Sequence, residues 1–136
     1  MGTVNASARW AGEQLNFIGT SYKGHQIPMG GDNISPTQML LLGLAGCTGM
    51  DVVSILQKKR QAVKDVQVQI TAHQPDEYPK PYHTIEIKYI VAGENLDATA
   101  VERAIALSAE KYCIVSQTLQ RPVELKTSFV IETGLE

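Results

Sequence analysis

Residues 35–60 read SPTQMLLLGLAGCTGMDVVSILQKKR, and this stretch decides how the rest of the chain must fold. Ser35 and Pro36 predict a helix start, because the serine side chain can cap free amides and proline at the first helical position sacrifices no hydrogen bond. The helix is predicted to run to about Arg60, where a run of basic residues favours the negative end of the helix dipole. Its first half is apolar on every side, which is typical of a helix surrounded by protein.

The length of this helix raises the question of what covers it. A helix of about 25 residues is about 37 Å long, longer than a compact domain of this size is wide. Because the helix is apolar all round, a second copy of the chain is the simplest cover. The sequence therefore predicts an obligate homodimer.

The segments before the helix alternate like strands. Two or three strands are expected there, from the pattern of Val4, Ala6, Ala8, Leu15, Phe17 and Tyr22. Residues 25–36 break the pattern with Gly30-Gly31-Asp32-Asn33 and two prolines, and they are expected to form a loop.

The segments after the helix predict a hairpin, two further helices and a strand. Residues 66–70 and 85–91 alternate on either side of a proline-rich turn, as in a hairpin with one wet face. A second helix should follow Asp97 and a short one should span residues 113–119, before a last strand over residues 123–131. The apolar stripe of the second helix consists of Val101, Ala104, Ile105 and Tyr112, interrupted by Ser108. The order predicts one α+β domain over residues 1–136.

Composition excludes several classes of protein. The chain has 136 residues, 43% of them hydrophobic, which suffices for one core. Its 12 basic and 14 acidic residues nearly balance, so nucleic acid and anionic membranes are not expected partners. The apolar run Met39–Ala45 is too short to cross a bilayer, and the N-terminal residues lack the pattern of a signal peptide, so a cytoplasmic protein is expected. In a reducing compartment the two cysteines are expected to be either inert core residues or reactive thiols.

Cys47 lies in the middle of the predicted helix, between Gly46 and the nearby Gly49. Each glycine inside a helix costs about 1 kcal/mol relative to alanine. Such small residues let a substrate, or another backbone, approach the sulfur. Cys47 is therefore a candidate reactive thiol, although a small buried core residue fits the same pattern.

Cys113 lies at the predicted junction of the two later helices. A helix N-terminus lowers the pKa of a thiol, and a junction can move, so the position suits a sulfur that must reach another. A buried junction residue is the alternative.

Two cysteine motifs resemble those of the OsmC/Ohr hydroperoxide-reductase family. They are Ser35-Pro36-Thr37-Gln38-Met39-Leu40 leading into Ala45-Gly46-Cys47-Thr48-Gly49-Met50-Asp51, and Tyr112-Cys113-Ile114-Val115-Ser116. The resemblance implies an OsmC-like fold, an intertwined homodimer with long central helices flanked by antiparallel sheets and with active sites at the subunit interface.

The activity implied by the resemblance is thiol-based reduction of organic hydroperoxides. Cys47 would attack the peroxide and become a sulfenic acid, and Cys113 would condense with it to a disulfide. An external dithiol would reset the pair, with no metal or organic cofactor. A non-enzymatic dimer that holds a hydrophobic small molecule in the same pocket, or a structural dimerisation domain, remains the alternative.

The sequence departs from the family where the thiol needs a cation. The family holds an activating Arg with a Glu ten residues before the cysteine, and Thr37 occupies that position here. Arg9 is the candidate activator, and an exposed strand residue is its alternative reading. Thr37, Gln38 and Met50 are the candidate substrate-binding residues.

Other ionisable residues carry weaker signals. Asp51 shares the helix face of Cys47 and is expected to make a polar interface contact, because a free carboxylate there would oppose thiolate formation. His25, His73 and His83 show no metal-ligand spacing with either cysteine, so no metal site is expected.

Overall fold

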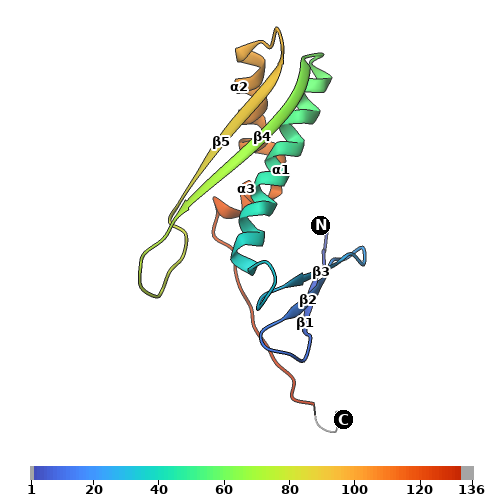
Figure 1. Cartoon of the computed structure of the whole chain (residues 1–136), viewed down its shortest axis with the longest axis vertical. Helices are drawn as coiled ribbons and strands as arrows, with labels where there is room; N and C mark the ends of the chain where they lie inside the picture. The colour runs from blue at the N-terminus through green and yellow to red at the C-terminus, as the bar shows by residue number, and fades with distance from the viewer. Residues whose placement is uncertain (1, 133–136) are drawn as a thin grey trace.

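The computed structural model describes residues 2–132 and has two antiparallel sheets and a long helix. In chain order the elements are β1 (Ser7–Trp10), β2 (Phe17–Thr20), β3 (Gln26–Met29), α1 (Pro36–Lys58), β4 (Ala62–His73), β5 (Thr84–Glu94), α2 (Ala98–Leu107), the π-helical turn η1 (Ser108–Tyr112) and α3 (Ile114–Leu119). The hairpin β4–β5 runs along α1 and α2, whereas the sheet β1–β2–β3 lies beyond the N-terminal end of α1 (Figure 1). The predicted α+β class is confirmed.

The long helix begins where the sequence predicts. The backbone N–H of Gln38 donates to Ser35 Oγ at 3.2 Å, and Pro36 takes the first helical position. The helix ends at Lys58, two residues before the expected end, and Arg60 adopts a left-handed conformation with φ of 58°. That conformation cannot continue a right-handed helix.

The predicted hairpin is also confirmed. β4 and β5 pair antiparallel over nearly their whole length, with Val68 opposite Tyr89 and Ile70 opposite Ile87. Alternate residues are half-buried beneath the helices or exposed to solvent, as the period of two requires.

The core lies between α1, α2 and one face of the hairpin. Val52 and Leu56 from α1 meet Ala100 and Ala104 from α2, and all four side chains are buried. The two alanines allow the helices to approach closely, and half-buried hairpin residues such as Val66 and Val91 close the core from below.

The predicted loop at residues 25–36 contains a strand, so that expectation was wrong. Gln26–Met29 pairs with β2 as β3, the edge strand of the three-stranded sheet. Pro28 has no N–H, and an edge strand tolerates it because one side of the strand needs no partner. The first strand is also shorter than the alternation suggested, since β1 begins at Ser7 and leaves Val4 and Ala6 outside.

The last predicted strand, residues 123–131, is not a strand within this protomer. The segment has no ladder partner among the described residues, and Val123, Leu125, Phe129 and Ile131 are exposed. Alternation alone does not make a strand, because a strand also needs a neighbour that supplies hydrogen bonds.

The second predicted helix changes character at the residue that interrupts its stripe. The α-helical geometry of α2 stops at Leu107, and η1 carries the chain from Ser108 to Tyr112. The backbone N–H of Cys113 donates to the Ser108 carbonyl at 2.9 Å, the wider spacing of a π-helix. Cys113 then caps α3, which confirms the predicted short helix.

By length and composition alone, α1 could cross a membrane, contrary to the expectation based on Met39–Ala45. Only 22% of its most apolar window is buried within the protomer. The helix also carries the hydrogen-bonded polar residues Thr48 and Asp51 and packs on a hairpin with a wet face. Those features are typical of a core helix whose remaining sides need a cover.

Candidate active site at the two cysteines

Cys47 lies on α1 with its side chain half-buried and no disulfide. Its neighbours on the helix differ in what they meet. A side chain at Gly46 would meet no atom within 4 Å, whereas a Cβ at Gly49 would lie 3.3 Å from Cγ2 of Val68 on β4. Gly49 therefore lets the helix approach the hairpin, and Gly46 borders open space on α1.

Cys113 is fully buried at the start of α3. Its sulfur accepts a hydrogen bond from the backbone N–H of Ser116 at 3.3 Å, so the thiol caps the short helix. Burial first, and then the neighbouring Cys47 thiol and the charge of Asp51, raise the pKa of Cys113 to about 11, and the Ser116 amide opposes that rise.

The fold therefore brings the two predicted cysteines together. They come from α1 and from the η1–α3 junction, and they lie close enough for the Cys47 side chain to raise the pKa of the Cys113 thiol. At neutral pH, Cys113 therefore keeps its proton.

A row of hydroxyl groups lies beside the thiol pair and was missed by sequence reasoning. Thr48 Oγ1 lies 2.6 Å from the hydroxyl of Tyr89 on β5 and 2.7 Å from Ser108 Oγ. Ser108 in turn donates to Asp51 Oδ2 at 2.9 Å. Thr48 and Ser108 are buried, and burial raises the pKa of Tyr89, with its hydrogen bond to Thr48 opposing that rise.

Two sequence signals could have pointed to this row. Ser108 interrupts an otherwise apolar stripe, and Thr48 directly follows the apolar first half of its helix. A buried polar side chain needs partners, so both residues called for hydroxyl or carboxylate neighbours. Asp51, which is expected to make a polar interface contact, accepts a hydrogen bond from Ser108 of its own chain.

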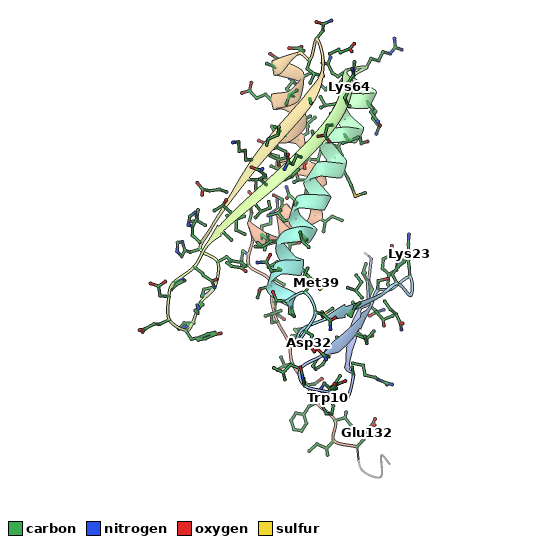
Figure 2. All side chains as sticks on the ribbon, viewed as in Figure 1. Trp10, Lys23, Asp32, Met39, Lys64 and Glu132 are labelled. Atoms are coloured by element: carbon green, nitrogen blue, oxygen red, sulfur yellow. The ribbon has the colours of Figure 1, made fainter. Side chains whose placement is uncertain are left out.

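The predicted cation lies elsewhere in the protomer. Arg9 is an exposed residue of β1 and stands opposite Ile18 of β2. In Figure 2 its neighbour Trp10 lies beyond the end of α1 marked by Met39. In residues 2–132, no Arg or Lys side chain donates a hydrogen bond to either sulfur.

The predicted substrate-binding residues fall on two separate hollows. Thr37 lines a groove of about 690 Å³ between α1, α3 and the far end of the hairpin, together with Leu44 and Ser116. Met50 is 75% exposed and lines another groove of about 590 Å³ between α1 and β4. Gln38 serves the helix cap through its backbone N–H.

No group of three or more His, Cys, Asp or Glu side chains within the described residues is arranged to hold a metal ion. His73 bonds Glu86 at 2.8 Å on the exposed side of the hairpin, and His25 bonds Ser21 in a turn. Neither histidine contacts the thiol pair by these bonds.

Comparison with known proteins places this site in a family. The family described as OsmC-like protein matches residues 29–128, which include both cysteines and the hydroxyl row. The chain belongs to the OsmC-like family. An OsmC-like relative, the protein YhfA of Escherichia coli K12, is 42% identical over 132 residues, covering 94% of this chain and 98% of YhfA.

Solved structures agree with this OsmC-like assignment. A hypothetical protein from Aquifex aeolicus VF5 is 33% identical, with a TM-score of 0.80 over 88% of this chain and 89% of that one. The organic hydroperoxide resistance protein OhrB of Bacillus subtilis shares the fold at 17% identity, with a TM-score of 0.56 over 88% of this chain and 91% of OhrB. The OsmC-like fold predicted from the two cysteine motifs is thereby confirmed.

Proposed function

We propose that this OsmC-like protein is a thiol-dependent peroxidase that reduces organic hydroperoxides. One observation carries the proposal: two free cysteines far apart in the sequence are neighbours in the fold, one half-buried and the other fully buried. A purely structural cysteine would not need a second sulfur as its neighbour. The name of the related fold OhrB, organic hydroperoxide resistance protein, supports the same substrate class.

The different burial of the sulfurs supports a division of labour. Cys47 is the more accessible sulfur, so it attacks the peroxide. Cys113, whose pKa of about 11 keeps it protonated, acts second as the resolving thiol.

The reaction balances without a metal or an organic cofactor. The Cys47 thiolate attacks the terminal peroxide oxygen, the O–O bond breaks, and the alkoxide takes a proton and leaves as an alcohol. Cys113 then attacks the resulting Cys47 sulfenic acid, the S–O bond breaks, and the hydroxide takes the Cys113 proton to leave as water. An external dithiol in the cytosol reduces the disulfide and restores both thiols.

The reactive thiolate needs a cation, and we assign that role to Arg9 from a second copy of the chain. Within one protomer Arg9 lies on a sheet beyond the end of α1. A partner could bring its own sheet to Cys47, as expected for an intertwined dimer. The residue Thr37, where the family has Glu, leaves this Arg less tightly held.

A homodimer is supported by the apolar residues that one protomer leaves open. Leu42 is 59% and Met50 75% exposed on α1.

The native mass in solution is expected to be twice the 14.8 kDa of the chain. Leu42→Asp should shift the protein to monomer or aggregate, because a carboxylate in an apolar interface is costly. Lys88→Asp, at an exposed polar residue of β5, serves as the control and should stay dimeric; light scattering that finds a wild-type monomer would overturn the dimer.

Intact mass under non-reducing conditions tests the proposed activity. After one equivalent of an alkyl hydroperoxide, the wild-type chain should lose two hydrogens as the disulfide forms. The Cys113→Ser variant should instead gain one oxygen as a stable sulfenic acid, which a dimedone-type reagent captures. An unchanged wild-type mass, with the alkyl compound bound tightly, would favour a different function.

That second function is a dimeric module that binds a hydrophobic small molecule. The specific observation in its favour is the groove of about 690 Å³, whose lining includes Leu40, Leu44 and Ile87. Leu44 precedes Cys47 by one helical turn, and Ser116 donates its backbone N–H to the Cys113 sulfur, so a ligand in this groove would lie close to both sulfurs.

A further inference from the structure

The hydroxyl row beside the cysteines has a defined direction. A carboxylate only accepts, so Ser108 must give its single hydrogen to Asp51. Thr48 must then donate to Ser108, and Tyr89 must donate to Thr48, since each hydroxyl has one hydrogen. The result is an ordered chain from Tyr89 through Thr48 and Ser108 to Asp51.

This row of hydrogen-bonded side chains joins the two segments that carry the sulfurs. Thr48 and Asp51 both follow Cys47 on α1, Thr48 by one position and Asp51 by one helical turn. Ser108 begins η1, and its carbonyl accepts the backbone N–H of Cys113 at 2.9 Å. The same residue therefore binds α1 with its side chain and Cys113 with its backbone.

The π-helical turn makes this double role possible. A regular α-helix would direct the Cys113 N–H to the carbonyl of residue 109, whereas η1 directs it to Ser108. In a regular α-helix, Ser108 would bond α1, and residue 109 would accept the hydrogen bond from Cys113. No single residue would then join the two segments. Single π turns of this kind are frequent at functional sites.

We propose that Thr48 and Ser108 are positioning residues which hold the Cys113 sulfur facing Cys47 and so set the rate at which the disulfide closes. The inference rests on the proposed thiol chemistry, but it does not depend on peroxide as the oxidant. According to this inference, the hydroxyl row affects only the closure of the disulfide by Cys113. The attack of Cys47 on its oxidant is not affected, because it requires no movement of η1.

An aryl disulfide reagent that releases a coloured thiolate separates the two steps. In the first step Cys47 attacks the reagent, its S–S bond breaks, and one aryl thiolate leaves. In the second step Cys113 loses its proton to solvent and attacks the mixed disulfide on Cys47, releasing a second aryl thiolate as the protein disulfide forms. The wild-type chain should release two equivalents and Cys113→Ser one.

Thr48→Val is the principal variant, because valine keeps the shape and removes the hydroxyl. The second release should slow by about tenfold or more when the sulfur loses its alignment, while the first should stay within about twofold. Thr48→Ser restores the hydroxyl and should bring the second release back to within about twofold of wild type. A purely structural role would not be rescued in this selective way.

The outcomes are separable. A second release at the wild-type rate in Thr48→Val, an equal slowing of both releases, or no rescue by Thr48→Ser would each overturn the inference. Should Thr48→Val fail to fold, Ser108→Ala takes its place, and an unchanged second release there overturns the inference equally. If hydroperoxide leaves the wild-type mass unchanged while both aryl thiolates are released, the proposed peroxidase fails and the positioning role stands.

Discussion

Replacing Cys47 with serine is expected to reduce hydroperoxide consumption to background. Removal of a covalent nucleophile costs about 10⁴-fold or more in enzymes where it has been measured. Serine at this position has no base to take its proton, so a neighbouring cation does not make its hydroxyl a nucleophile, and serine cannot pass through a sulfenic acid. The measurement is the loss of an alkyl hydroperoxide, and the appearance of its alcohol, with a dithiol present in excess.

The matched control for this prediction is Cys113→Ser. This variant keeps the attacking sulfur, so one equivalent of hydroperoxide should still be consumed in a single turnover without dithiol. Equal consumption by Cys47→Ser and wild type would show that the attacking group is not this sulfur, and the assignment of roles to the two cysteines would be lost.

Replacing Leu56 with alanine is expected to lower the free energy of unfolding by about 2–5 kcal/mol. Leu56 is completely buried on α1 and packs with Val52 and with Ala100 and Ala104 of α2. The alanines opposite Leu56 have side chains too short to fill the space that it would leave, so the cavity should stay open. Since domains of this kind are stable by only about 5–15 kcal/mol, the loss is large.

Denaturation by urea measures this effect, with Leu15→Ala as the control. Leu15 is 74% exposed in a turn before β2, and its truncation should change the free energy of unfolding by no more than about 0.5 kcal/mol. The midpoint should move for Leu56→Ala while the slope of the transition stays constant. Equal effects of the two variants would contradict the α1–α2 packing described above.

Local signals predicted much of this fold. Ser35 and Pro36 announce the start of α1 because a cap and a first helical position depend only on adjacent residues. The alternation of β4 and β5 and the short helix after Cys113 were likewise found from their periods. In each case the decisive interaction lies within a few residues, or within two strands joined by a turn.

The errors concern elements whose state depends on distant partners. Gln26–Met29 becomes a strand because β2 offers it a ladder, despite Pro28. Residues 123–131 alternate as a strand should, and yet have no such ladder with any part of residues 2–132. A sequence window shows the pattern of a strand but not its neighbour.

The sequence by itself determined the helix that carries Cys47, the hairpin that supports it and the presence of two sulfurs in family-like motifs. The tertiary structure alone decided that Cys113 is the buried sulfur with the raised pKa and that Thr48, Ser108 and Asp51 form one hydrogen-bonded chain. The physical reason is that capping and periodicity act between near neighbours along the chain. Desolvation and hydrogen-bond geometry instead depend on groups that only packing brings together.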